Sequence, residues 1–144
     1  AAEGPRVVRE GRDVTLVGAG HSAYLCEQAA EILAAEGVSA EVVDVRVLNP
    51  LHAQPIIRSV RKTGRLFAVD GGWRTAGWSA EILAAVTETI HPTELLGRPV
   101  RITLPDAPAP ASKALELIYY PTAALIVETV RASLRQERQV KAPA

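Results

Sequence analysis

Cysteine, net charge and long apolar runs are all scarce in this sequence. The single cysteine, Cys26, excludes an intramolecular disulfide and favours a reducing compartment. The 16 basic and 16 acidic side chains cancel, so no excess of positive charge is available for nucleic acid or an anionic membrane. No apolar run approaches the ~20 residues that cross a bilayer, and no signal peptide is recognisable. We therefore expect a cytoplasmic protein with no nucleic-acid or membrane partner.

The sequence also lacks a self-sufficient catalytic or metal-binding pattern. It has no G-x-S-x-G motif, no phosphate loop ending in Lys-Ser/Thr and no carboxylate pair at a fixed spacing. His21, His52 and His91 are scattered, with no cysteine or carboxylate beside them in a metal-ligand pattern. Only His21 lies at a loop-to-helix junction where chemistry could occur, and a solvated histidine is the commoner situation there. Cys26 falls within a predicted helix without a basic neighbour, which favours a buried, inert thiol.

The apolar residues, 48% of the chain, alternate between strand-like runs and segments with helical spacing. The length fits one domain over residues 1–144, with a core of about 5–135 and a frayed polar tail at 136–144. The pattern predicts strands over 7–10, 14–17, 41–48, 66–69 and 100–104, and helices over about 22–36, 52–62, 77–90 and 121–135. Such alternation predicts an α/β fold with a mostly parallel sheet, covered by helices on both faces and linked by right-handed crossovers.

The segment Gly18-Ala19-Gly20-His21-Ser22-Ala23 has the form G-x-G-x-x-A between a predicted strand and a predicted helix. Its glycines would let the backbone approach a pyrophosphate, and Asp44 follows at about the distance of a ribose-binding acid. A tight strand-to-helix turn also requires glycine for steric reasons alone. A free-standing dinucleotide-binding protein that uses Gly18, Gly20 and Asp44 is therefore one alternative function.

Residues 70–81 follow the most apolar strand, at the edge where open α/β sheets bind ligands. Trp73 and Trp78 stand out in a chain that is 4% aromatic, because exposed loop tryptophans usually fill an interface or a ligand pocket. Arg74 could stack on Trp73 or pair with a carboxylate. Alternatively, the side chains of both tryptophans fold back over the helix ends and belong to the local core. We predict an interface or site wall that contains Asp70, Gly72, Trp73, Arg74, Thr75, Gly77 and Glu81.

Five segments occur in an order that is familiar from one family: GRDVTLV (11–17), DVRVLNPL (44–51), RKTGRL (61–66), GWRT (72–75) and PDAPAP (105–110). Together they closely resemble the C-terminal domain of transketolase-like enzymes. The branch they most resemble is the E1 β subunit of pyruvate and branched-chain 2-oxoacid dehydrogenases. The likeness runs from about Pro5 to Leu134 and implies a three-layer α/β/α sandwich, with one antiparallel strand in a five-stranded sheet.

The resemblance also implies where the cofactor of the complete enzyme lies. In the family, thiamine diphosphate and Mg²⁺ sit between a pyrimidine-binding domain and a diphosphate-binding domain or subunit, and this domain alone does not bind them. Its implied role is assembly, through dimer contacts, support of the neighbouring active site and docking of an E2 acyltransferase. The chain departs from the family pattern in having Val69-Asp70 for an acidic pair, Ala76 and Ser79 for glycines, and His52 for aspartate.

The functional hypothesis is a non-catalytic C-terminal domain or subunit of a thiamine-diphosphate enzyme, as a fragment or a split-gene product. The complete enzyme would decarboxylate a 2-oxoacid or transfer a two-carbon unit. A scaffold that kept the fold and lost the enzyme is a further alternative, beside the dinucleotide-binding protein. Interface candidates outside the 70–81 segment are His21, Pro105, Asp106 and Pro108.

Overall fold

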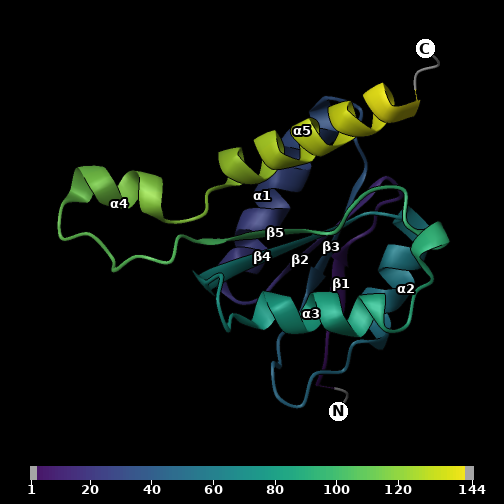
Figure 1. Cartoon of the computed structure of the whole chain (residues 1–144), viewed down its shortest axis with the longest axis horizontal. Helices are drawn as coiled ribbons and strands as arrows, with labels where there is room; N and C mark the ends of the chain where they lie inside the picture. The colour runs from purple at the N-terminus through teal and green to yellow at the C-terminus, as the bar shows by residue number, and fades with distance from the viewer. Residues whose placement is uncertain (1–2, 142–144) are drawn as a thin grey trace.

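The computed structural model describes residues 3–141 as a five-stranded sheet between two layers of helices (Figure 1). The elements in chain order are β1 (Arg6–Arg9), β2 (Val14–Gly18), α1 (His21–Ala35), β3 (Ala40–Asp44), α2 (Gln54–Thr63), β4 (Leu66–Trp73), α3 (Trp78–Thr87), the 3-10 helix η1 (Pro92–Glu94), β5 (Val100–Leu104), α4 (Lys113–Tyr119) and α5 (Ala123–Lys141). The sheet order is β1-β3-β2-β4-β5. Only the β1–β3 pair is antiparallel among the described strands. This confirms the predicted α/β/α sandwich and its mostly parallel sheet.

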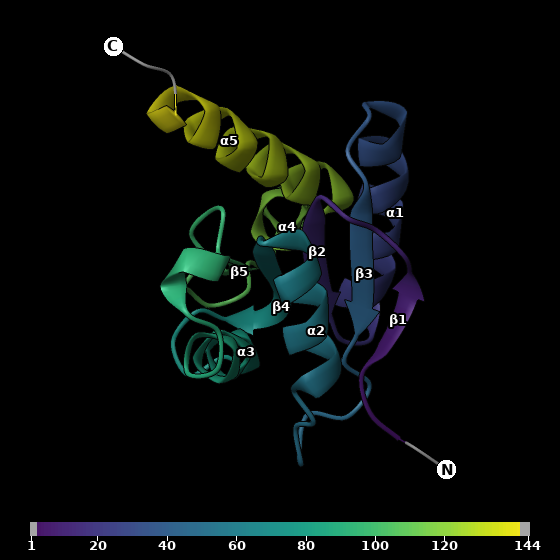
Figure 2. The ribbon, with the colours of Figure 1, turned by 90° about the vertical axis from the view of Figure 1, so that its right-hand side faces the viewer.

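The central strands are apolar on both faces because a helical layer covers each of them (Figure 2). In β2, Val14 and Leu16 pack with the α1 and α5 side, whereas Val17 packs with the α2 and α3 side. In β4, Phe67 and Ala68 divide between the two cores in the same way. Because helices cover both faces, a ligand can reach the sheet only at the ends of the strands and along its two edges.

Two strand boundaries differ from the sequence prediction. Strand β3 ends at Asp44 and does not continue to residue 48, because Arg46 adopts a positive φ of 61° that turns the chain out of the sheet. Strand β4 continues beyond Gly71-Gly72 as far as Trp73, because Trp73 pairs with Leu104 of β5 after an irregularity in the ladder. Both boundaries depend on neighbours that the local pattern does not contain.

The C-terminal region also corrects the sequence prediction. Residues 113–119, for which the sequence pattern predicts no element, form α4. Residues 136–141, expected to be frayed, continue α5, and residues 142–144 lie outside the described range. The end of α5 is fixed by Glu137, whose carboxylate accepts hydrogen bonds from Arg65 Nε at 2.9 Å and Nη2 at 2.7 Å. Both side chains are largely buried, at 17% and 11% exposure. This pair ties the end of α5 to the start of β4.

Replacing Glu137 with alanine should therefore lower the free energy of unfolding by about 2 kcal/mol, because Arg65 loses its bidentate partner in a partly buried place. Urea denaturation measures the change. Glu128→Ala is the matched control on the same helix, since Glu128 is 60% exposed where it pairs with Arg131. The control should change stability by less than about 1 kcal/mol. Equal losses in the two variants would contradict a structural role for the end of α5.

Candidate functional site

Asp70 is buried at the end of the main β4 ladder and organises the turn into α3. Its Oδ1 accepts a hydrogen bond from the Gly72 N–H at 2.8 Å, and its Oδ2 accepts one from the Ser79 N–H at 3.1 Å. Ser79 lies in the first turn of α3, where backbone N–H groups lack helical partners, so the carboxylate stabilises the helix start. A Cβ on the N-cap residue Gly77 would lie 2.3 Å from the Trp73 carbonyl oxygen, so only glycine fits there.

Trp73 and Trp78 have different roles in this turn. Trp73 is 56% exposed, and its Nε1 donates to the hydroxyl of buried Tyr119 at 3.1 Å. Tyr119 in turn donates to the Ala107 carbonyl at 2.6 Å. Trp78 instead packs against the core on the α2 and α3 side. Trp73 thus occupies an exposed position at the carboxyl end of β4, as an interface residue would. Trp78 instead belongs to the local core.

The turn after β4 and the proline-rich loop after β5 lie side by side. Thr75 donates to the Asp106 carboxylate from its backbone N–H at 3.3 Å and from its hydroxyl at 3.1 Å. Arg74 donates to the Arg101 carbonyl at 3.5 Å, so the structure shows neither the predicted stacking nor the predicted carboxylate pair for its guanidinium. An open cleft of about 430 Å³ lies between the two segments. Its lining consists of Trp73, Thr75, Asp106, Ala107 and Pro108.

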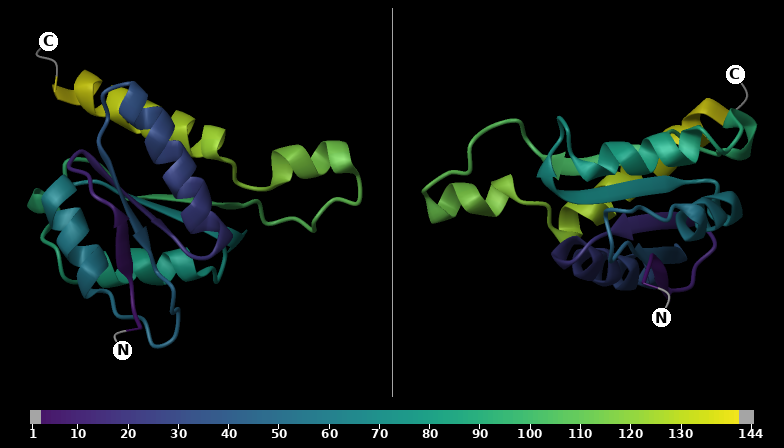
Figure 3. Two further views of the ribbon diagram at one scale, coloured as in Figure 1. Left: turned by 180° about the vertical axis from the view of Figure 1, so that it is seen from behind. Right: turned by 90° about the horizontal axis from the view of Figure 1, so that it is seen from below.

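The segment 105–122, which we call the arm, carries α4 away from the sandwich (Figures 1 and 3). Much of its apolar surface faces solvent, with Leu117 at 72% and Ile118 at 81% exposure, and Leu115 and Tyr120 are exposed as well. The sequence prediction assigns no element to residues 111–120, although the run ALELIYY has the apolar composition of a short helix. The cleft beside Trp73 shares Asp106, Ala107 and Pro108 with the arm.

The other predicted site residues lie apart from this cleft. His21 is the first residue of α1 and is exposed, with its ring centroid 6.0 Å from that of Tyr24. Glu81 is exposed on α3, and Pro105 is exposed at the start of the arm. Of the predicted residues, the structure brings Trp73, Thr75, Asp106 and Pro108 to one cleft.

The glycine turn after β2 has a steric explanation. A Cβ on Gly18 would lie 2.6 Å from the backbone of Ser22 and Ala23, so glycine lets the first turn of α1 pack directly on the strand. The Asp44 carboxylate accepts a hydrogen bond from the Arg46 N–H at 3.2 Å, which stabilises the turn after β3.

Cys26 is fully buried in α1, and burial raises the pKa of its thiol strongly. This environment keeps the thiol protonated and unreactive.

Neither a metal centre nor a membrane span occurs within residues 3–141. No three His, Cys, Asp or Glu side chains of this range are grouped so that they could hold a metal ion. None of the described helices has both the length and the apolar composition that a bilayer crossing requires.

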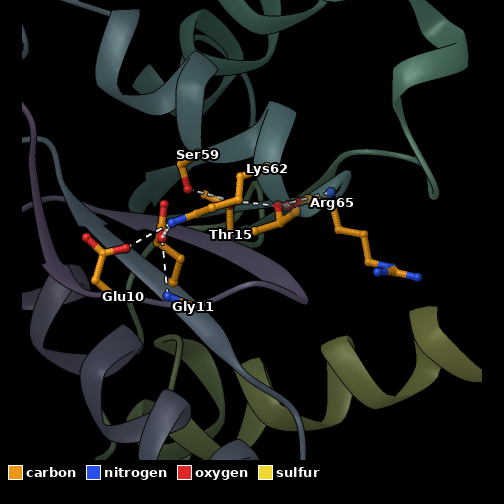
Figure 4. Close-up of polar contacts among 8 residues, drawn as sticks. Glu10, Gly11, Thr15, Ser59, Lys62 and Arg65 are labelled. Carbon is orange, nitrogen blue, oxygen red and sulfur yellow. Dashed lines mark hydrogen bonds and ion pairs between the residues drawn. The ribbon is translucent and has the colours of Figure 1, made fainter.

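A second polar cluster lies at the opposite end of the parallel strands, where β1 meets the body of the domain (Figure 4). The buried Glu41 carboxylate contacts Lys62 Nζ and accepts a hydrogen bond from the Gly11 N–H at 3.2 Å, and Lys62 also donates to Glu10 at 2.9 Å. Burial alone would raise the pKa of Glu41, but the hydrogen bonds from Lys62, Ser59 and Gly11 outweigh it and lower that pKa. We call Glu10, Gly11, Glu41 and Lys62 the β1 clamp.

Comparisons with known proteins agree with this fold. The family model "Transketolase, C-terminal domain" matches residues 4–126. The chain is 44% identical over 112 residues to the mitochondrial pyruvate dehydrogenase E1 component subunit beta of Dictyostelium discoideum, covering 77% of this chain and 31% of that protein. It is 35% identical over 129 residues to the acetoin:2,6-dichlorophenolindophenol oxidoreductase subunit beta of Cupriavidus necator, covering 90% of this chain and 38% of that protein.

A solved structure described as "Split gene transketolase, inactive beta4 tetramer" matches with a TM-score of 0.79 and 28% identity, covering 91% of this chain and 42% of that one. The chain therefore spans between about 31% and 42% of the length of these relatives. This chain belongs to the transketolase C-terminal domain family.

Proposed function

We propose that this chain serves as the non-catalytic C-terminal part of a thiamine-diphosphate-dependent enzyme of the 2-oxoacid dehydrogenase E1 β type. Its similarity to pyruvate dehydrogenase E1 β subunits supports this assignment. The cofactor supplies the carbanion chemistry of 2-oxoacid decarboxylation and would be held by pyrimidine-binding and diphosphate-binding domains or subunits of the same enzyme. The part played by the present residues is to position those neighbours.

The exposed apolar arm is the observation that carries this proposal. A seven-residue helix is too short to be stable alone, and α4 has apolar side chains on more than one face. Burying a leucine or isoleucine side chain contributes about 1.5–3 kcal/mol, so Leu117 and Ile118 offer substantial binding energy to a covering protein. We infer that a neighbouring domain of the enzyme covers the arm.

The contacts around Trp73 hold the arm in a defined direction. Asp70 fixes the turn after β4, and the hydrogen bonds from Trp73 to Tyr119 and from Tyr119 to Ala107 join that turn to both ends of the arm. The Thr75–Asp106 contacts add a second attachment. A surface oriented in this way loses less conformational entropy on binding than a free loop would. The turn and the arm therefore act as one docking surface.

Replacing Ile118 with aspartate should weaken binding to the pyrimidine-binding domain of the same enzyme by at least about 30-fold, the effect of losing an interface hot spot. Binding is measured by calorimetry with the two purified proteins. Val140→Asp is the matched control, because Val140 is also 81% exposed but lies near the far end of α5. Both variants should keep the melting temperature of the parent.

Equal affinities for the two variants would disprove the docking role of the arm.

The assignment as a non-catalytic part is tested separately, on the chain without its partners. Calorimetry with thiamine diphosphate and Mg²⁺ should show no binding to the 144-residue protein. Turnover of a 2-oxoacid by this protein alone would overturn the assignment as a non-catalytic part.

A further inference from the structure

A larger cleft, of about 620 Å³, lies at the carboxyl end of β3, toward the edge of the sheet opposite β5. Arg6 at the start of β1, Arg46 just after β3 and His52 just before α2 contribute to its walls. Gly4 borders His52, since a Cβ on Gly4 would lie 3.9 Å from the His52 ring. Nothing in the docking surface of the arm involves these residues.

The charges around this cleft are unbalanced. Arg6, Arg46 and His52 are exposed, and their side chains make no ion pair or hydrogen bond with any residue in the 3–141 range. Glu3 is the one carboxylate in the cleft wall. Asp44, which pairs with Arg6 in the β1–β3 register, already accepts a hydrogen bond from the Arg46 backbone. The lining side chains therefore carry a formal charge of +1, from two guanidinium groups and one carboxylate. Asp44 at the end of β3 lies beside them but forms no ion pair with either guanidinium in the described residues.

The backbone at Arg46 is strained in a way that shapes the cleft. Its φ of 61° is unfavourable for a residue with a Cβ, and glycine or asparagine usually occupies such a position. The Asp44 carboxylate and the Val47 N–H bond to the Val45 carbonyl hold this turn. Strained residues of this kind are concentrated at ligand sites. The guanidinium of Arg46 is therefore held at the cleft wall by a backbone conformation that arginine rarely adopts, as expected if it contacts a ligand.

We propose that this cleft binds a phosphate group carried by a small molecule. Two guanidinium groups and an imidazole supply the planar forks and the N–H donors that phosphate oxygens accept. A carboxylate shares part of this chemistry, but it has fewer acceptor oxygens and a smaller charge than phosphate. Phosphate therefore matches the two guanidinium groups and the imidazole better than a carboxylate does.

Inorganic phosphate titrated into the full chain at constant ionic strength tests the assignment, with backbone amide chemical shifts as the readout. The amides of Gly4, Arg46 and His52 should move together. Arg46→Gly should raise the Kd about tenfold, as loss of a charge-assisted hydrogen bond does, and Arg6→Gln should do the same. Glycine accommodates the positive φ at position 46, so the first variant keeps its fold.

Arg12→Gln is the control, because it removes one exposed positive charge at the opposite end of the strands. It should leave the Kd for phosphate unchanged within about twofold, since a charge so distant is screened. The same Kd in all variants, or shifts outside the cleft, would overturn the proposal. Acetate binding as tightly as phosphate would overturn the assignment to phosphate. The chain is tested without partners, so neither outcome depends on the role of the arm.

Discussion

Replacing Lys62 with methionine should lower the free energy of unfolding by about 3 kcal/mol, the low end of the cost of breaking a buried ion pair. Glu41 is 1% exposed and would keep its charge without the ammonium group that compensates it. The low end applies because the Lys62 side chain is itself 44% exposed and water can partly replace it. Urea denaturation at neutral pH measures the loss.

Two further variants separate the buried pair from a general effect of charge. Arg61 precedes Lys62 on α2 and pairs with Glu94 where both side chains are exposed, so Arg61→Met should cost less than about 1 kcal/mol. Adding Glu41→Gln to Lys62→Met should recover part of the loss, because a neutral amide needs no counter-charge. A cost for Lys62→Met no greater than that for Arg61→Met would show that the β1 clamp contributes little.

The pH dependence of unfolding gives an internal check on the same pair. The pKa of Glu41 is lowered in the folded chain, so its contribution is present above the unfolded value of about 4.3 and is lost as pH falls through the folded value. Hydrogen bonds from Lys62 to Glu41 and Glu10 raise the pKa of Lys62, so its contribution is lost only in strong alkali. The parent should therefore lose stability in acid more steeply than Glu41→Gln.

Replacing Asp70 with alanine should cost about 3 kcal/mol of unfolding free energy, because two backbone N–H groups lose a buried charged acceptor and α3 loses its stabilising carboxylate. Thermal and urea denaturation measure this loss. Asp70 is 1% exposed, so its carboxylate contacts only the turn after β4 and the start of α3 within this chain. The variant should also weaken partner binding, since the turn that holds Trp73 would relax.

Asp106→Ala is the matched control for Asp70→Ala. Asp106 also accepts two hydrogen bonds, both from Thr75, but it is exposed. Its loss should cost less than about 1 kcal/mol, because water replaces the carboxylate. Similar costs for the two variants would mean that burial of Asp70 does not set its importance.

The sequence alone predicts those strands whose position depends only on burial of their side chains. Strands β2 and β4 are read from their apolar runs because both faces are covered. The end of α5 depends on the contact between Arg65 and Glu137, which lie 72 residues apart, and no local pattern reveals such a pair. The extension of β4 to Trp73 depends on Leu104 in the same way.

The candidate site could be predicted only in outline. Each tryptophan follows a glycine in the same short segment, and only the packed structure separates exposed Trp73 from half-buried Trp78. No pattern in the sequence indicates the cleft beside β3. Arg6 and Arg46 are far apart in the chain and meet because β1 runs antiparallel to β3. Side chains brought together by strand pairing carry no signal in a single sequence.

The arm has a consequence for how such domains diversify. It leaves the sandwich after β5 and rejoins it at α5, whose buried face of Ile126, Val127 and Val130 is seated in the core independently of the arm. Substitutions at the exposed arm residues Leu115, Leu117 and Ile118 can therefore accumulate without disturbing the folded body. Buried Tyr119 and Pro121 tie the arm to that body and are not free to change in the same way. Under the proposed docking role, a change of partner would then require new side chains mainly at these exposed arm positions.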